Sequence, residues 1–224
     1  MPRRTALAQP KTTATTMSAR AKRPAPVIAG SATGQLRVEQ ILETARTILV
    51  RDGHAGLSMR KVAQESGIAL GHLQHFFATR EALLNGLFRY ASDTYDANYE
   101  RVMVDLPEDP RRRFEAVLDF LLEDGTRWES RAFFFEFWVL SLRNPAAKAE
   151  IESMHAHHRE AMEQHIAALN PSMSAAKRRD RAMQIAAIID GLMVHMRTDD
   201  KNSAAYRARI ADVRRTILRL AEEV

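Results

Sequence analysis

The sequence predicts an all-α fold of about nine helices, with an N-terminal three-helix domain followed by a larger helical domain. Apolar residues recur at helical spacing from residue 37 onward, and the sequence contains neither strand-like alternation nor an internal repeat. Breaks that contain glycine or proline separate the helical segments. Hydrophobic residues make up 46% of the 224 residues, which suffices for a substantial core.

Residues 1–34 are predicted to form a disordered basic tail, because they are rich in Thr, Ala, Pro and Arg and lack sustained periodicity. The first 36 residues carry six basic and no acidic residues, which leaves 27 basic and 28 acidic residues for the rest. The net charge of +5 therefore does not argue that the folded body binds nucleic acid. The tail is a solvated extension or a start-site artefact, with Met17 as the initiator. The alternatives are a basic arm that touches DNA and a transit peptide.

The first helix is expected from Arg37 to Asp52, where a left-handed glycine at Gly53 ends it. Ser58 is a favourable N-cap for a second, short helix, and Gly67 makes the turn to a third. A helix, a glycine turn and a second helix of this length are typical of a helix-turn-helix DNA reader, here at residues 58–77. The apolar residues expected to pack between these helices are Val38, Ile41, Leu42, Ala45, Ile48, Leu49, Met59, Val62, Ala63, Ile68, Leu73 and Phe77.

Thr79 is expected to cap a fourth helix that runs to about Val104, where Leu106-Pro107 and Asp109-Pro110 break the chain. Segment 129–142 is apolar on nearly every side, so it should be a buried helix. The other helices are expected at 111–124, 144–169, 175–196 and 204–222.

About 50 residues from Arg37 to Leu87 match a known pattern in order and spacing. The matching positions are Gly53, Ser58, Val62-Ala63, Gly67-Ile68-Ala69, Gly71, Phe77, Thr79-Arg80-Glu81 and Leu83-Leu84. This segment resembles the N-terminal domain of TetR-family transcriptional repressors, which implies a DNA-binding domain at residues 35–95. The family usually has Tyr where this chain has Gln74, so operator preference does not carry over from relatives.

The short helix from Ala69 to Phe76 is the candidate base reader, because Ala69 and Gly71 let its N-terminal end approach DNA and Gln74 can bind adenine bidentately. Ser58 and Thr79 lie at helix N-termini, where free amides favour phosphate. His72 and His75 are DNA contacts in this interpretation and ordinary surface histidines in the alternative. The expected DNA contacts are Arg37, Ser58, Arg60, Lys61, Ala69, Leu70, Gly71, His72, Gln74, His75, Thr79 and Arg80, with Arg37, Arg60, Lys61 and Arg80 as phosphate clamps.

Residues 96–224 are expected to bind a ligand and to dimerise, as the resemblance implies. Phe137-Trp138 and residues 187–192 are similar to the BetI-like subgroup. An aromatic pocket with an aspartate suits a cation, and the alternative is that these residues make plain core. The expected ligand-binding residues are Met103, Phe134, Phe137, Trp138, His158, Met162, Asp190 and Met193.

Apolar stripes on the last two helices predict a four-helix dimer interface, to which each subunit contributes two helices. The alternative is that both stripes cover the subunit's own core. The expected interface residues are Ile185, Ile189, Leu192, Met196, Tyr206, Ile210, Val213 and Ile217.

The sequence therefore predicts a homodimeric, sequence-specific DNA-binding regulator, namely a repressor that a small molecule of unknown identity releases from a palindromic double-stranded operator. The alternatives are a constitutive regulator and a helix-turn-helix protein that binds a partner without a small-molecule effector. No enzymatic motif, cofactor or metal site is expected, and the spacing of His155, His158 and His165 is typical of a solvated helix face. The lack of cysteine and of an apolar run near 18 residues fits a bacterial cytoplasmic protein that does not bind membranes.

Overall fold

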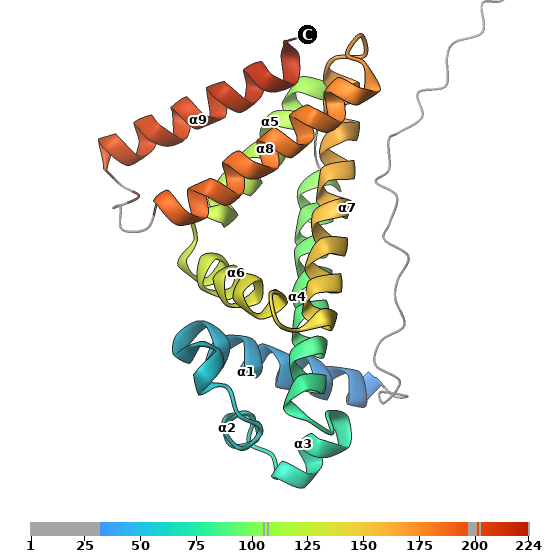
Figure 1. The fold of residues 1–224 in the computed structure, drawn as a ribbon, viewed down its shortest axis with the longest axis vertical. Coiled ribbons are helices and arrows are strands. Elements are labelled where there is room, and N and C mark those ends of the chain that lie inside the picture. The colour runs from blue at the N-terminus through green and yellow to red at the C-terminus, as the bar shows by residue number, and fades with distance from the viewer. Residues whose placement is uncertain (1–31, 105, 107, 197–200, 202, 224) are drawn as a thin grey trace, which may run out of the picture.

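The computed structural model describes residues 32–104, 106, 108–196, 201 and 203–223, and within them the all-α prediction is confirmed (Figure 1). The bulk of the predicted tail lies outside the described residues, although residues 32–34 belong to the first helix. The described chain forms nine helices, α1 (Ala32–Gly56), α2 (Met59–Glu65), α3 (Leu70–Phe76), α4 (Arg80–Val104), α5 (Pro110–Gly125), α6 (Trp128–Ser141), α7 (Pro145–Leu169), α8 (Ala175–His195) and α9 (Ala204–Glu222).

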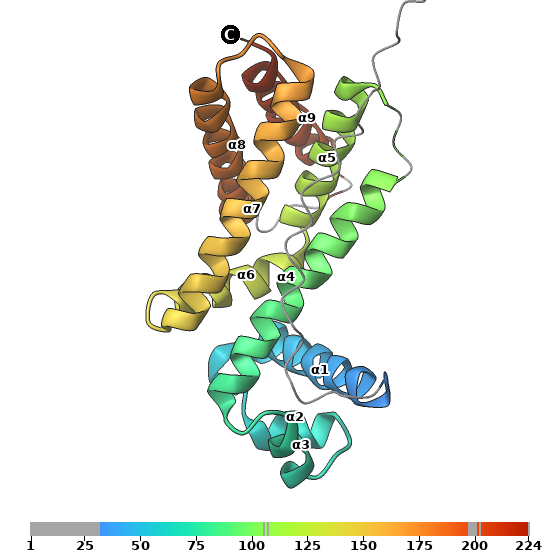
Figure 2. The ribbon, with the colours of Figure 1, turned by 90° about the vertical axis from the view of Figure 1, so that its right-hand side faces the viewer.

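Two domains share the long helix α4. Helices α1–α3 and the start of α4 form a small reader domain, and α5–α9 gather around the other end of α4 (Figure 2). The domain boundary expected at residue 95 falls inside α4, and the helix continues across it without a break. Because a helix is stiff along its axis, α4 connects the two domains mechanically.

Polar side chains cap the starts of the helices where the sequence places them. The hydroxyl of Ser58 accepts from the Lys61 N–H at 3.2 Å, and that of Thr79 accepts from the Ala82 N–H at 3.1 Å. Asn144 accepts from two backbone N–H groups at the start of α7. The regular geometry of α1 is interrupted at Gly53, whose φ of 69° lies in the left-handed region, as predicted.

The domain formed by α5–α9 is called the upper domain, from its place in Figure 1. One continuous core joins the reader domain to the base of this upper domain. Phe88 of α4 and Phe137 of α6 are both fully buried and stack with ring centroids 4.0 Å apart. This core includes buried residues of α1–α4, α6 and α7. Helix α6 packs on both α1 and α7, so it is the part of the upper domain that lies against the reader.

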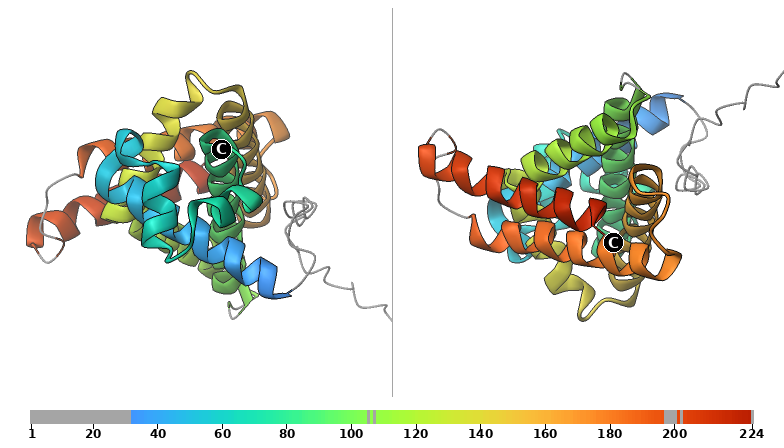
Figure 3. Two further views of the ribbon diagram at one scale, coloured as in Figure 1. Left: turned by 90° about the horizontal axis from the view of Figure 1, so that it is seen from below. Right: turned by 90° about the horizontal axis from the view of Figure 1, so that it is seen from above.

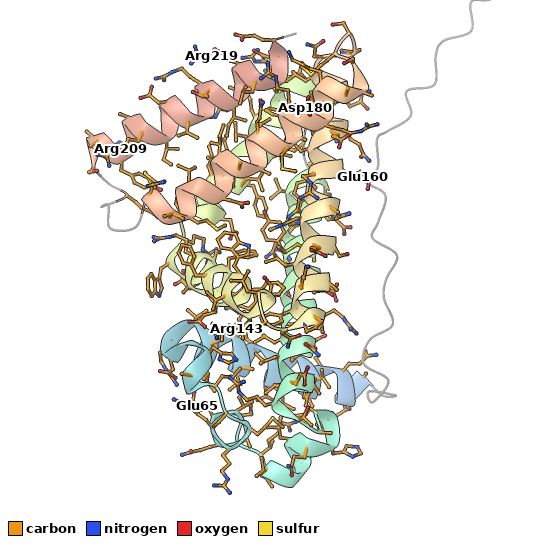
Figure 4. The ribbon with its side chains drawn as sticks, in the orientation of Figure 1. Glu65, Arg143, Glu160, Asp180, Arg209 and Arg219 are labelled. Atoms are coloured by element: carbon orange, nitrogen blue, oxygen red, sulfur yellow. The ribbon has the colours of Figure 1, made fainter. Side chains whose placement is uncertain are left out.

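A second core fills the far end of the molecule, where α8 and α9 lie side by side over α5 (Figure 3). Tyr99 of α4 and Phe114 of α5 are buried in it. Figure 4 shows the side chains that fill the space between these helices, while Glu160 on α7 and Arg209 on α9 point away from it.

Candidate nucleic-acid interface and effector cavity

Helices α2 and α3 form a helix-turn-helix whose turn is fixed by backbone bonds. Gly67 has a φ of 66°, which a side chain would disfavour, and the Ile68 N–H donates to the Ala63 carbonyl at 3.0 Å. Leu73 and Phe76 anchor α3 in the core, with 0% and 9% of their surface exposed. The seven residues of α3 are therefore held by packing, since a helix this short is not stable by itself.

The outer side of the helix-turn-helix carries the side chains that the sequence predicts to contact DNA bases. The rings of His72 and His75 lie against the Phe76 ring, with centroids 5.3 and 5.6 Å away, so their positions depend on the buried anchor. Leu70 is half-buried beside the core. The exposed residues among the expected contacts are Ser58, Arg60, Ala69, Gly71, His72, Gln74, His75 and Thr79.

The phosphate-clamp role expected for Arg80 requires a correction. Its Nε donates to the Leu57 carbonyl at 2.7 Å, and its Nη2 donates to the His54 carbonyl at 2.6 Å. The guanidinium therefore holds the end of α1 against the start of α4. Sequence reasoning missed this role because the carbonyl partners are 23 and 26 residues away and carry no side-chain signal.

Two other expected clamps also have partners within the protein. The ammonium of Lys61 lies 2.9 Å from the Asp52 carboxylate, which also pairs with Arg51. Arg37 donates to the Gln40 side chain at 2.8 Å. Both pairs are near the surface, where such contacts are weak and a phosphate can compete for the cation. Arg60 is exposed at the start of α2.

A cavity of about 230 Å³ lies inside the upper domain, between α4, α5, α6, α7 and α8, and is called the effector cavity below. Phe134 and Trp138 of α6 line the end nearer the reader, and His165 lines the wall formed by α7. Six of the eight expected ligand-binding residues line it, namely Phe134, Trp138, His158, Met162, Asp190 and Met193. Met103 packs beside the second core instead, and Phe137 is fully buried against Phe88, so neither lines this cavity.

Three carboxylates in the cavity wall surround Tyr95. Burial raises the pKa of Tyr95 well above its usual range, and the negative charges of Asp124, Asp96 and Asp190 add to the rise. Burial also raises the pKa of Asp124 and of Asp190, although a hydrogen bond from the Ser130 hydroxyl opposes this at Asp124. The cavity is therefore partly aromatic and holds three carboxylates, whose charge Arg159 in the same lining partly offsets. Sequence reasoning found Asp190 and missed Tyr95, Asp96 and Asp124, which lie on helices it did not connect.

His165 and Tyr99 form a hydrogen-bonded pair in the wall of the cavity. Burial lowers the pKa of His165 to about 4, and the nearby Arg113 charge contributes. The imidazole is therefore neutral near pH 7, and its tautomer decides whether Nε2 accepts from the Tyr99 hydroxyl or donates to it. His158 lies 3.5 Å from the Asp96 carboxylate.

The apolar stripes expected to form the dimer interface mostly face inward. Ile185 and Ile217 are fully buried in the single chain, and four further stripe residues keep less than a tenth of their surface, so the interface prediction is wrong for these six. They are Ile185, Ile189, Leu192, Met196, Tyr206 and Ile217, all members of the second core, while Ile210 and Val213 are half-buried at its edge. A stripe shows that a helix packs, without showing whether the partner is the same chain.

The opposite face of α8 is apolar and open. Met183 and Val194 are 53% and 46% exposed, and a side chain at Gly191 would meet nothing within 4 Å. Ala187 lies between them on the same face and is exposed as well, and Met183 and Ala187 also line the cavity, so this face borders it. Small residues of this kind allow another helix to approach closely.

Nothing in the described part of the chain groups three or more His, Asp or Glu side chains into a metal-binding arrangement. Among the helices described above, none combines the length and the apolar character that a membrane span requires.

Comparison with known proteins identifies both domains. Residues 41–87 match the model of the bacterial regulatory proteins of the tetR family, and residues 110–222 match that of the BetI-type transcriptional repressor C-terminal domain. A BetI transcriptional regulator from Burkholderia cenocepacia is 27% identical over 161 residues, which cover 70% of this chain and 80% of the relative. A regulator from the dhlA 5' region of Xanthobacter autotrophicus is 28% identical over 141 residues, which cover 62% and 70%.

Solved structures share the fold. A transcriptional regulator from Rhodococcus superposes with a TM-score of 0.69 at 22% identity, covering 84% of this chain and 98% of that one. A regulator from Saccharomonospora viridis, solved in complex with choline, superposes with a TM-score of 0.64 at 17% identity, covering 84% and 97%. TetR-family regulators bind DNA, dimerise and are not enzymes. This chain belongs to the TetR family of bacterial transcriptional regulators and has a BetI-type C-terminal domain.

Proposed function

We propose that this regulator is a homodimeric repressor that leaves its operator when an organic cation enters the cavity of the upper domain. One observation carries the proposal, namely that α4 begins at the reader, with Thr79 as its cap, and lines the cavity with Tyr95, Asp96 and Tyr99. A ligand that moves α4 therefore acts on an element to which the reader is attached.

In this proposal α3 reads the operator from the major groove. Gln74 presents an amide suited to adenine, His72 and His75 present ring nitrogens, and Ala69 and Gly71 leave room for the base edges. Arg60, Arg37 and Lys61 bind phosphates, while Ser58 and Thr79 present the amides of helix N-termini. Arg80 supports the reader from inside.

The three carboxylates of the cavity wall favour a cationic effector. Asp124 and Asp190 gain a counterion when a cation binds, and Trp138, Phe134 and Tyr95 present aromatic faces to it. The choline bound to a regulator of similar fold supports an organic cation as the class to test first. The cation stabilises the conformation of the dimer whose two α3 helices are wrongly spaced for DNA, so DNA and cation weaken each other's binding.

The dimer forms through the exposed face of α8, defined by Met183, Ala187, Gly191 and Val194, together with the neighbouring surface of α9. This face is apolar, lies on the opposite side of α8 from the buried stripe, and borders the effector cavity at Met183 and Ala187. Two copies related by a two-fold axis would present two α3 helices to successive major grooves.

The test is fluorescence anisotropy of labelled DNA from upstream of the coding sequence, at several salt concentrations and with or without choline. We expect specific binding whose logarithm falls linearly with the logarithm of salt concentration, and weaker binding with choline. Specific binding that neither choline nor a panel of larger organic cations changes would favour a constitutive regulator. Failure to prefer this DNA over scrambled DNA would favour a helix-turn-helix protein that binds a partner.

A further inference from the structure

A second cavity of about 320 Å³ lies next to the effector cavity, where the reader meets the upper domain. Helix α1 contributes Glu43 and Arg46, α4 contributes Ser92 and Asn98, and the start of α6 contributes Ser130. We call this space the junction cleft. Its inner wall is shared with the effector cavity and consists of Tyr95, Asp124, Phe134 and Met154.

The hydroxyl of Ser92 is the first sign that the junction cleft binds a polar molecule. Ser92 is 1% exposed and lines the cleft, and its Oγ has no hydrogen-bond partner among the described residues. A buried hydroxyl without a partner is costly, and buried polar atoms are nearly always paired. A hydrogen-bonding occupant of the cleft would satisfy it.

The charges of the lining indicate the sign of that occupant. The guanidinium of Arg46 is bound by Glu43, with N–O distances of 2.7 to 3.1 Å, so these two charges neutralise each other. Of the remaining charges, Asp124 is half-buried, whereas Glu129 and Arg127 are exposed at the rim. The inner part of the cleft therefore has one carboxylate without a full counterion, and Ser130 binds one of its oxygens at 2.7 Å.

We propose that the junction cleft is a second ligand site, which binds a small protonated primary amine. The ammonium group donates to Asp124 and to the Ser92 hydroxyl, and the aromatic wall of Tyr95 and Phe134 covers its carbon chain. A quaternary ammonium has no N–H to donate, so it suits the effector cavity better than this cleft. An amine bound here contacts both α1 and α6, and it changes the angle between the reader and the upper domain. Only the change in the angle between the reader and the upper domain rests on the proposed function.

The lack of cysteine in the chain makes the site directly testable, because Ser92→Cys would carry the only thiol. The variant is treated with methanethiosulfonate reagents that bear either an aminoethyl cation or a sulfonatoethyl anion. Thr47→Cys, exposed on α1 and outside both cavities, is the matched control for intrinsic reactivity. We expect the cation-to-anion rate ratio to be about tenfold higher at Ser92→Cys than at the control. Adding Asp124→Asn should bring the ratio down to the control value.

Free amines then test the class of ligand. Ethylamine is expected to protect Ser92→Cys from the reagent at millimolar concentration, and tetramethylammonium is expected not to. Equal protection by ethylamine and tetramethylammonium would show that the junction cleft is an extension of the effector cavity. If ethylamine does not protect the thiol, or if the reagent does not modify it in the folded protein, the second ligand site is ruled out. Thr94→Cys, at another position in the lining, repeats the test if Ser92→Cys does not fold.

The same thiol tests the effect on DNA binding. Ser92→Cys that carries the aminoethylthio group, joined through a disulfide bond with loss of methanesulfinate, is expected to bind the operator about tenfold more weakly than the same variant capped with a neutral methylthio group. If the two bind DNA equally while choline still releases the unmodified protein, the junction cleft has no regulatory effect and the proposed function stands. If ethylamine protects the thiol but no cation changes DNA binding, the second site stands and the proposed function fails.

Discussion

The carboxylate of Glu136 accepts a hydrogen bond from the backbone N–H of His54 at 3.0 Å and so joins α6 to the corner between α1 and α2. The carbonyl of the same His54 accepts from Arg80 at 2.6 Å. A side chain at Gly53 would meet the Glu136 oxygen at 3.0 Å, and its φ of 69° disfavours one as well. The two peptide groups of His54 thus link α6, which lines the effector cavity, to the start of α4.

Replacing Glu136 tests whether this link transmits the effector signal. Glu136→Ala should lower the free energy of unfolding by about 1–3 kcal/mol, because a charged acceptor is lost from a half-buried N–H. The ratio of operator affinities without and with choline should move toward one, measured by anisotropy. Glu136→Gln keeps a carbonyl acceptor and should preserve the ratio. A full choline response in Glu136→Ala would rule out this route of coupling.

Substitutions of Arg80 and Arg60 distinguish a residue that supports the reader from one that contacts DNA. Arg80→Ala should lower the free energy of unfolding by about 1–3 kcal/mol, since two backbone carbonyls lose a charged donor. It should weaken DNA binding without changing the salt slope. Arg60→Ala should leave stability unchanged and reduce the slope by about one, because an exposed phosphate contact is lost. Urea unfolding measures the stability, and anisotropy at several salt concentrations measures the salt slope. A reduced slope in Arg80→Ala would show that Arg80 is a phosphate clamp after all.

The recognition helix is tested at its exposed side chains. His72→Ala and Gln74→Ala should each weaken specific operator binding by roughly 1–3 kcal/mol, because a base contact is lost. Both side chains are exposed, so thermal stability should change little. Gln64→Ala, exposed on α2, is the matched control. Operator affinity that survives both substitutions would remove α3 as the base reader.

Local signals allowed much of the fold to be predicted from the sequence. Ser58, Thr79 and Asn144 cap helices through bonds to residues two or three positions away, so type and spacing suffice to recognise them. The errors concern partners that are distant in sequence. Ile185 and Ile217 were expected between subunits and lie inside one, because an apolar stripe does not identify the surface that buries it.

The effector cavity also shows that the sequence does not identify neighbours that are distant along the chain. Phe134 and Trp138 could be predicted because they lie in a conspicuous aromatic segment of one helix. Tyr95 and Asp124 belong to α4 and α5, and only the packing of these helices brings them to the same wall. Phe137 has the same residue type as Phe134 but is fully buried and stacks on Phe88 in the first core.

The dimer surface is tested at Val194, which is 46% exposed on α8. Val194→Glu should shift the protein from dimer to monomer in sedimentation at micromolar concentration, since a charge would be buried at the interface. Its helical circular dichroism should be unchanged, because the position is open in the single chain. Ala156→Glu, exposed on α7, should remain dimeric. A dimeric Val194→Glu would place the interface elsewhere.

His165 makes the stability of the protein sensitive to mild acid. Burial lowers its pKa from 6.5 to about 4 in the folded chain, so the unfolded chain takes up the proton first as the pH falls. Stability is therefore fully present above pH 6.5 and is lost between pH 6.5 and about 4, by up to about 3 kcal/mol. His165→Gln keeps an acceptor for the Tyr99 hydroxyl without the titration. The difference in unfolding free energy between the two proteins, measured by urea denaturation from pH 7 to 4, isolates this contribution from the buried carboxyls. A difference that does not vary with pH would show that His165 has the same pKa in the folded and the unfolded chain.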